Sequence, residues 1–346
     1  MRNKIGIITL TDMYNYGNSL QNYAVQQIIN KLGFIPETLF VSFGGIKILA
    51  IIKSIIKGSY YHKKILSFKH FNKRNLTIRY RNHFNVNTNS QYDAFVVGSD
   101  QVWNTSWYDT FPFMKEVYLL CFADNNKKIS FAASFGIDVV KSNYNEFFSS
   151  QLLKFKALSV REEAGSEIIK ELTGKDAEVL VDPTMLLDRE EWQKIYKKPK
   201  HAKEGYILTY FLSPKCNEAK VKLEDIKGNK EVYELLNPDD KVAGSAGPSE
   251  FLWLFDHADI ILTDSFHACV FSFLFNKPFI VYDRNWDGGN MNSRLETLLS
   301  KFSLERKYAN SGIENDIWEH DYTEGYKQLE IERKKAIDFL KKALED

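Results

Sequence analysis

The chain has 346 residues, of which 44% are apolar and 26% charged, and its formal net charge is +1. These are the values of a globular protein long enough for two domains, and they exclude a disordered chain, a collagen-like repeat and a globally basic surface for nucleic acid. Three cysteines without a CxxC pair are typical of reduced thiols, and no run of 18 apolar residues predicts a membrane span. We therefore expect a cytoplasmic protein without a signal peptide.

The first segments of the chain predict an α/β domain. Residues 5–10 form a short apolar run with β-branched side chains, as in a buried parallel strand. A polar turn follows at residues 11–18, and residues 19–32 have apolar side chains at helical spacing that stop before Gly33, a good helix cap. Strand, loop and helix in this order form the opening βα unit of an α/β fold.

A basic stretch then interrupts the pattern. Residues 38–92 contain seven Lys, three Arg and no Asp or Glu, so their net charge is +10. Residues 46–57 within it have amphipathic helical spacing, which fits either a helix packed on the core or a basic helix at an anionic membrane surface. The second reading predicts peripheral membrane contact through residues 46–64, carried by Lys47, Lys53, Lys57, Lys63 and Lys64.

The remaining strand-like runs form two groups. The first group lies at residues 94–98, 128–133, 157–160 and 179–182, and the second at residues 206–211, 230–236, 260–263 and 279–282. We expect a first α/β domain at residues 1–198 with the basic insertion at about 38–92, a second α/β domain at residues 199–320, and a C-terminal helix at residues 321–346 that can cross back to the first domain. Two doubly wound domains of this kind face each other across a cleft, and ligands bind beyond the carboxyl ends of their strands.

The loop after the first strand is a candidate sugar site. Asp12, Asn18 and Gln21 lie in or just after this loop, where their side chains suit the hydroxyl groups of a sugar. A helix begins there, so its backbone N–H groups also suit an anion. Ordinary turn chemistry is the alternative, because Asp, Asn and Gly dominate turns.

A second polar cluster follows the strand at residues 94–98. Asp100, Gln101, Trp103 and Asn104 place polar groups beside an indole, a combination that is common in sugar sites. The alternative is a helix start capped by Asp100. Trp103 fits no amphipathic pattern, which favours the functional interpretation.

Three cationic residues also follow predicted strands or loops. Arg161 has the geometry to fork onto a phosphate or carboxylate, although an ion pair with the neighbouring glutamates is the alternative. His267 lies at a strand-to-helix junction beside Ser265, where a ring can bind phosphate or transfer a proton near neutral pH. The alternatives are a buried structural histidine and a helix-capping role for Asp264 or Ser265. Arg294 follows a Gly-rich loop and either reaches the cleft or starts a surface helix. No spacing of His, Asp or Glu resembles a metal site.

Five segments in this order resemble the polysaccharide pyruvyl transferase family. They read NYGNSLQNYA at residues 15–24, YDAFVVGSDQVWN at 92–104, SVREEAG at 159–165, VDPTMLL at 181–187 and TDSFHACVFSFLFNKPF at 263–279. The resemblance implies a GT-B-like fold with the active site between two Rossmann-like domains. It also implies phosphoenolpyruvate as donor, a pair of sugar hydroxyls as acceptor, and a pyruvate ketal on a cell-surface polysaccharide or its lipid-linked precursor as product.

The resemblance assigns roles to particular residues. Arg161 and His267 match the family's donor-binding residues, and His267 also suits a proton-transfer role. Asp12, Asn18 and Asp100 would face the acceptor with one carboxylate as base, and Gln21, Gln101, Trp103 and Asn104 would complete the acceptor site. The chemistry requires a general acid, a general base and anion-binding groups, but no metal or other cofactor.

One position departs from the family pattern. Many members have Arg two residues before the motif histidine, in a Met-Arg-Leu-His sequence, whereas this chain has Ser265 there. An expected anion-binding group is therefore missing, and Arg294 or Arg284 is the candidate replacement. A different donor in this branch of the family is the other explanation.

Two further function classes stay open. One is a glycosyltransferase or another group transferase of GT-B-like fold that uses a different phosphorylated donor, although no Glu-based ribose motif occurs between Pro238 and Asp264. The other is a glycan-binding protein without catalysis. Loss of turnover on replacement of Arg161 or His267 distinguishes an enzyme from such a protein.

Overall fold

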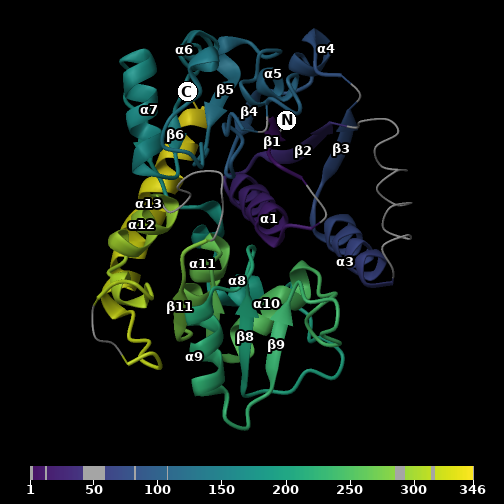
Figure 1. Ribbon diagram of the computed structural model, residues 1–346. Helices are drawn as coiled ribbons and strands as arrows, with labels where there is room; N and C mark the ends of the chain where they lie inside the picture. The colour runs from purple at the N-terminus through teal and green to yellow at the C-terminus, as the bar shows by residue number, and fades with distance from the viewer. Residues whose placement is uncertain are drawn as a thin grey trace.

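The computed structural model describes residues 3–11, 14–41, 59–81, 83–106, 108–284, 293–312 and 316–345 (Figure 1). Asp12 and residues 46–58 of the predicted membrane segment lie outside the described residues. The described chain contains two parallel sheets with helices packed on them, one sheet built before residue 180 and the other after residue 205. The predicted α/β architecture with two Rossmann-like sheets is thereby confirmed.

The first sheet has the strand order β3-β2-β1-β4-β5. Its strands are β1 (Lys4–Ile8), β2 (Ile35–Val41), β3 (Ile78–Arg81), β4 (Ala94–Val97) and β5 (Lys128–Ser130). Two short parallel strands, β6 (Ser159–Val160) and β7 (Glu178–Val179), continue it through single bridges from Ile129 to Ala157 and from Ala133 to Val160. Ile5 and Ile7 of β1 join the core on one face, and Ile8 joins the core on the other, as expected for a parallel sheet buried on both faces.

The second sheet has the strand order β11-β10-β8-β9. Its strands are β8 (Tyr206–Tyr210), β9 (Val232–Leu235), β10 (Ala258–Thr263) and β11 (Phe279–Val281), and all pairs are parallel. Each of the four lies within one or two residues of a strand expected from the sequence. Thus the long apolar runs of this half were sufficient to locate its strands.

Helices of the first half lie between the strands of its sheet. They are α1 (Tyr16–Lys31), α3 (Ser59–Asn75), α4 (Val86–Asn89), α5 (Met114–Tyr118), α6 (Asn145–Leu152) and α7 (Glu163–Thr173). The second half contributes α8 (Arg189–Gln193), α9 (Asn217–Lys227), α10 (Pro248–His257), α11 (Phe266–Leu274), α12 (Ser293–Lys301) and α13 (Thr323–Glu345). None of the described helices is both long enough and apolar enough to cross a membrane.

A shared apolar core joins the two sheets. Tyr16, the first residue of α1, stacks on Phe251 of α10 with ring centroids 4.5 Å apart, and its hydroxyl donates to the Ala246 carbonyl at 2.9 Å. Both rings are fully buried. Burial of two aromatic rings across the junction stabilises one arrangement of the two halves, so the loops at the ends of both sheets are held in register.

The C-terminal helix α13 returns to the first half, as the sequence led us to expect. In Figure 1 it runs from the second half back toward the first sheet, where Lys335 donates to the Val179 carbonyl of β7 at 3.0 Å. Arg333 donates to the carbonyls of Met185 and Leu187 at 2.7 and 3.0 Å, and the Phe339 ring stacks on Phe131. The helix therefore ties the end of the chain to the segment that connects the two sheets.

Helix α3 corrects one part of the membrane prediction. Lys64 is only 2% exposed, and its ammonium group lies 4.7 Å from the centre of the Tyr16 ring, a cation–π contact. It therefore points into the junction between the two halves and cannot bind a membrane surface. Lys63, one residue earlier on α3, is exposed.

Candidate active site

Two helix N-termini meet where the sheets face each other. Helix α1 follows β1, and α11 follows β10, so both helices begin beyond the carboxyl end of a strand. Gly17 in the first turn of α1 packs directly on His267 in the first turn of α11, and a Cβ atom at Gly17 would lie 2.1 Å from His267 Nδ1. The positive ends of both helices therefore favour an anion near this contact.

Arg161 lies at the centre of the site. It follows β6, is 3% exposed, and donates through Nη1 to the Ser99 carbonyl at 2.9 Å and to Asp182 Oδ2 at 2.5 Å. Its guanidinium group lies 4.6 Å from the centre of the Phe266 ring. Burial opposes the charged form, but the carboxylates of Asp182 and Asp100 outweigh burial and raise the pKa of Arg161. Arg161 therefore forms its ion pair with Asp182, which lies 21 positions later in the chain, and not with the glutamates next to it.

Asp182 is the functional neighbour that the sequence reasoning missed. Its Oδ1 accepts from Thr184 N and Oγ1 at 2.9 and 2.7 Å, and its Oδ2 lies 3.6 Å from His267 Nε2. Burial alone would raise the pKa of Asp182, but His267 and Arg161 outweigh burial and lower it. The signal was the VDPTMLL segment at residues 181–187, which begins in a predicted strand and is one of the five segments that carry the family resemblance.

His267 connects the two halves of the site. Its side chain is almost fully buried between Gly17, Asp182 and the Phe266 ring. Within the described part of the chain, Nε2 has no hydrogen-bond partner. The imidazole therefore lies next to both a carboxylate and an arginine, because Asp182 also accepts from Arg161.

Arg294 reaches the same cluster from α12. It is 5% exposed, and with the Gln101 amide oxygen turned toward it, both Nη atoms donate to that oxygen at 2.8 and 2.9 Å. Burial lowers the pKa of Arg294 to about 10, and the positive charge of Arg161 adds to this effect. A second guanidinium therefore lies next to Arg161, although position 265 is serine.

Glu162 and Asp264 are buried carboxylates that position backbone segments. Glu162 Oε1 accepts from Ser134 Oγ, Phe135 N and Gly136 N at 2.8–3.2 Å. Asp264 accepts from the backbone N–H groups of Leu212 and Ser213, so it fixes the loop after β8 and does not cap α11. Ser265 occupies the N-cap position of α11 without a capping side-chain bond.

A cavity of about 390 Å³ lies beside this cluster in the first half. Its polar lining residues include Asn15, Asn18, Asp100 and Gln101, and its apolar ones include Leu39, Phe40, Met114 and Val117. Three of the residues expected to bind an acceptor or act as base (Asn18, Asp100 and Gln101) therefore line one cavity.

The other predicted acceptor residues, Gln21, Trp103 and Asn104, do not line this cavity but contact residues that do. The Gln21 amide donates to Thr9 Oγ1 at 2.7 Å and accepts from Ser99 N at 3.3 Å, so it ties two loops together. Trp103 is fully buried between Phe135 and Phe155, its Nε1 donates to the Tyr118 carbonyl, and it offers no open face to a sugar in this structure. The Asn104 amide contacts Gln101 at 2.9 Å. Among the described residues, no His, Cys, Asp and Glu side chains gather in a metal-binding group.

Comparison with known families identifies the class of the protein. The family model described as polysaccharide pyruvyl transferase matches residues 15–285, which include Arg161, Asp182 and His267 but not strand β1 or Arg294. The chain belongs to the polysaccharide pyruvyl transferase family. Membership makes the protein an enzyme of the transferase class, with a glycan acceptor and a small-molecule donor. None of the curated protein sequences compared with the chain matches it.

Several solved structures are similar in fold to this family member. One is a UDP-GlcNAc 2-epimerase from Neisseria meningitidis bound to UDP-GlcNAc, with 10% identity, a TM-score of 0.44, and coverage of 97% of this chain and 99% of that chain. Another is Arabidopsis thaliana UGT89C1 complexed with UDP-L-rhamnose, with 9% identity, a TM-score of 0.48, and 99% coverage of both chains. A third is the uncharacterized protein KP1_0663 from Klebsiella pneumoniae, with 12% identity, a TM-score of 0.45, and coverage of 87% and 89%.

Proposed function

We propose that the protein transfers the pyruvyl group of phosphoenolpyruvate to two hydroxyls of a sugar, forming a ketal on a polysaccharide or its lipid-linked precursor. The observation that carries the proposal is the convergence of Arg161, Arg294 and His267 from three elements of the two halves. A donor with a phosphate and a carboxylate needs two cationic groups, and two buried guanidinium groups supply them.

The donor site includes the start of α11. Arg161 and Arg294 would bind the phosphate and the carboxylate, with Ser265 and the first amides of α11 beside them. The cavity that Arg161, Asp182, Phe266 and Arg294 line has a volume of only about 10 Å³, so the donor must displace contacts among these side chains. The Gln101 contact of Arg294 is the one most easily exchanged, because a neutral amide competes weakly with a phosphate or carboxylate for a guanidinium.

The reaction is a balanced exchange at C2 of the donor. A proton adds to C3, one sugar hydroxyl attacks C2, the bond from C2 to the phosphate oxygen breaks, and the second hydroxyl closes the ketal. Of the two hydroxyl protons released, one replaces the proton used at C3 and the other leaves with phosphate. His267, held between Asp182 and Gly17, is the proposed proton donor at C3, and Asp100 or Asp12 is the proposed base at the sugar.

The acceptor sugar would occupy the cavity of about 390 Å³ in the first half. Asn18, Asp100 and Gln101 supply hydrogen-bonding groups on the side that faces Arg294. For a lipid-linked acceptor we further propose peripheral contact of the protein with an anionic membrane through Lys47, Lys53, Lys57 and Lys63. If the protein sediments with liposomes to the same extent at all salt concentrations, or regardless of the anionic lipid content, this part of the proposal is contradicted.

Phosphate release from phosphoenolpyruvate, measured with a panel of galactosides and N-acetylhexosaminides, tests the proposal. We expect release that depends on an acceptor and that Arg294→Gln and His267→Gln each lower by about 100-fold or more. The matched controls are Arg306→Gln and His257→Gln, which change the same residue types outside the site. Release without acceptor dependence, or equal losses in the controls, contradicts the proposal. Stabilisation by another phosphorylated donor, with no release, would indicate the alternative transferase.

A further inference from the structure

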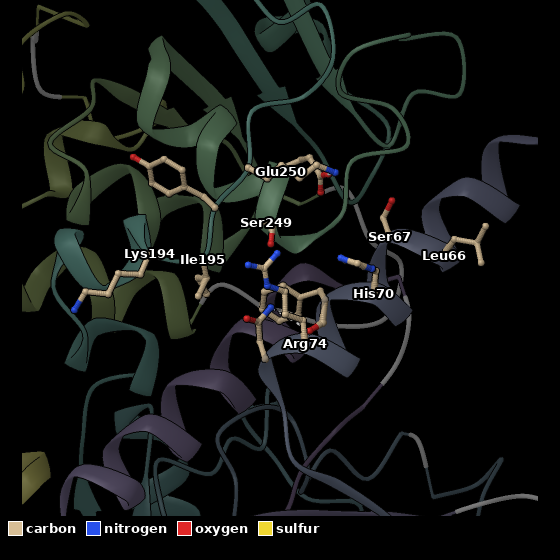
Figure 2. Close-up of a pocket in the computed structure, with 12 residues that line it drawn as sticks. Leu66, Ser67, His70, Arg74, Lys194, Ile195, Ser249 and Glu250 are labelled. Carbon is tan, nitrogen blue, oxygen red and sulfur yellow. Dashed lines mark hydrogen bonds and ion pairs between the residues drawn. The ribbon is translucent and has the colours of Figure 1, made fainter.

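A groove of about 450 Å³ lies on another part of the molecule, between helix α3, the segment after α8 and the start of α10 (Figure 2). It shares no lining residue with the two cavities of the candidate active site. Its walls come from both halves of the chain, because α3 belongs to the first sheet's half and α10 to the second. A ligand in the groove would therefore contact both halves at once.

The groove carries an excess of positive charge. Its cationic or protonatable lining residues are His70, Arg74, Lys194 and Lys197, and its one lining carboxylate is Glu250. That carboxylate is already used, since it pairs with Lys197 at 2.9 Å and accepts from Gly247 N at 3.2 Å. Within the described residues, no hydrogen bond or ion pair involves the side chains of Arg74, His70 or Lys194. The groove therefore has cationic groups whose charge no neighbouring carboxylate balances.

The side chains converge on one point of the groove. Figure 2 shows the Arg74 guanidinium and the His70 ring pointing from α3 toward Ser249, while the Lys194 chain lies at the outer end and points away from them. Ser249 adds a hydroxyl group, whereas the Ser67 hydroxyl already donates to the Lys63 carbonyl at 3.1 Å, and Phe71 and Ile195 add apolar surface. A forked guanidinium with a nearby hydroxyl donor is an arrangement suited to the tetrahedral oxygens of a phosphate.

The surroundings strengthen this preference for an anion. Helix α3 contains no acidic residue, and it lies within the acid-free stretch of residues 38–92. No carboxylate one turn away on α3 can therefore turn toward Arg74. A concave surface lined by one sign of charge raises the local concentration of ligands of the opposite sign.

We propose that this groove is a second anion site, which binds the phosphate group of an organic phosphate or diphosphate through Arg74, with His70 and Ser249 beside it. The volume of about 450 Å³ leaves room beside one phosphate for a further group: a second phosphate, or a polar or apolar part that lies on Phe71 and Ile195. The same chemistry occurs in soluble phosphate esters and in phospholipid headgroups. The site does not depend on the proposed pyruvyl transfer.

Hydrogen exchange with inorganic diphosphate as the probe tests the site locally. We expect diphosphate to protect peptides that cover residues 66–75 and 194–197, beyond any effect of sodium chloride at equal ionic strength. Arg74→Gln should weaken this protection by about tenfold or more in apparent affinity, because it removes a charge-assisted bond. Lys73→Gln, on the same helix but outside the groove, is the matched control.

The outcomes separate this site from the candidate active site. Diphosphate bound near Arg161 and His267 protects other peptides and does not respond to Arg74→Gln. Absence of protection at residues 66–75, or equal losses in Arg74→Gln and Lys73→Gln, overturns the proposal. Glycerol 3-phosphate and vesicles of phosphatidylglycerol then distinguish the two sources of the phosphate. Binding of glycerol 3-phosphate that Arg74→Gln weakens indicates a soluble ester, and vesicle binding that Arg74→Gln weakens indicates a lipid headgroup. If Arg74→Gln changes the binding of neither probe, the proposal is overturned.

Discussion

The buried arginines of the candidate active site and the arginine of the groove illustrate two ways of keeping a guanidinium ready for an anion. Arg161 and Arg294 are almost fully buried, and their positions depend on Asp182 and Gln101. Arg74 is exposed on one helix face, with no carboxylate paired to it in the described structure. Burial holds Arg161 and Arg294 in a defined geometry, but the protein loses stability when the partner of a buried guanidinium is removed. Arg74 is solvated, so its loss costs little stability.

The largest effect is expected from Arg161→Gln. It leaves Asp182 buried without its cationic partner, so the free energy of unfolding should fall by about 3–5 kcal/mol, and turnover should fall to background. Urea unfolding and phosphate release measure the two effects. The double variant Arg161→Gln with Asp182→Asn should recover part of the stability without recovering turnover. Recovery of neither, or a single variant as stable as the wild type, would contradict the assigned pair.

Gly17→Ala tests the contact between the two helix N-termini. A Cβ atom at this position would lie 2.1 Å from His267 Nδ1, and the three nearest atoms all belong to the His267 ring, so that ring must move. We expect turnover to fall about 100-fold, which is typical of a misplacement near 1 Å. Gly165→Ala in α7, where the nearest atoms lie at 3.3 Å, is the control for a glycine replacement in a helix. Equal turnover in the two variants would show that His267 has no positional role.

An intermediate case sharpens the comparison. Glu37 is buried but its partner Arg79 is half-exposed, and the Arg79 hydrogen bond, with help from Tyr92, lowers the pKa of Glu37 to about 2 although burial acts in the opposite direction. Because the folded pKa lies below the unfolded one, this contribution to stability is present above about pH 4.3 and disappears as the pH falls toward 2.

Unfolding measured between pH 2 and 5 checks this contribution. The wild type should lose stability more steeply with falling pH than Glu37→Gln, which has no carboxylate to protonate at this position. Parallel curves for the two proteins would show that the Glu37 carboxylate is not held in its ionised form by Arg79.

The smallest effect is expected at the groove. Arg74→Gln removes no hydrogen bond or ion pair of the described structure, so the free energy of unfolding should change by at most about 0.5 kcal/mol. Thermal unfolding with and without diphosphate measures both stability and ligand response. A loss of several degrees without ligand would show that Arg74 has a structural partner, and the contrast between the two regions would then fail.

The sequence predicted the parts of the fold and site that depend on local pattern. Apolar runs located β1, β4 and the four strands of the second sheet. The polar residues expected after strands, Arg161, His267 and Asp100, lie close together in the structure, and their roles stay predictions. Strand β2 was missed because Pro36 and Glu37 break its apolar pattern. Helix α3 was missed because its many lysines mask the apolar pattern of the buried face, which includes Phe68 and Phe71.

Partner choice could not be read from the chain. Arg161 has two glutamates directly after it, yet it pairs with Asp182, because the carboxyl ends of β6 and β7 lie side by side. Trp103 looked free for a sugar because no local apolar pattern includes it, but Phe135 and Phe155, which bury it, are more than 30 residues away. In both cases the deciding neighbours come from distant segments of the chain.

Phosphoenolpyruvate labelled with ¹³C at C2 tests the central claim most directly. The account predicts that, with a competent sugar acceptor, the labelled carbon appears as a ketal attached to the sugar, that phosphate is released in equal amount, and that Arg294→Gln and His267→Gln both abolish the ketal signal. Label that stays in phosphoenolpyruvate or appears only as free pyruvate with every acceptor, while another phosphorylated donor stabilises the protein through the same residues, would contradict it.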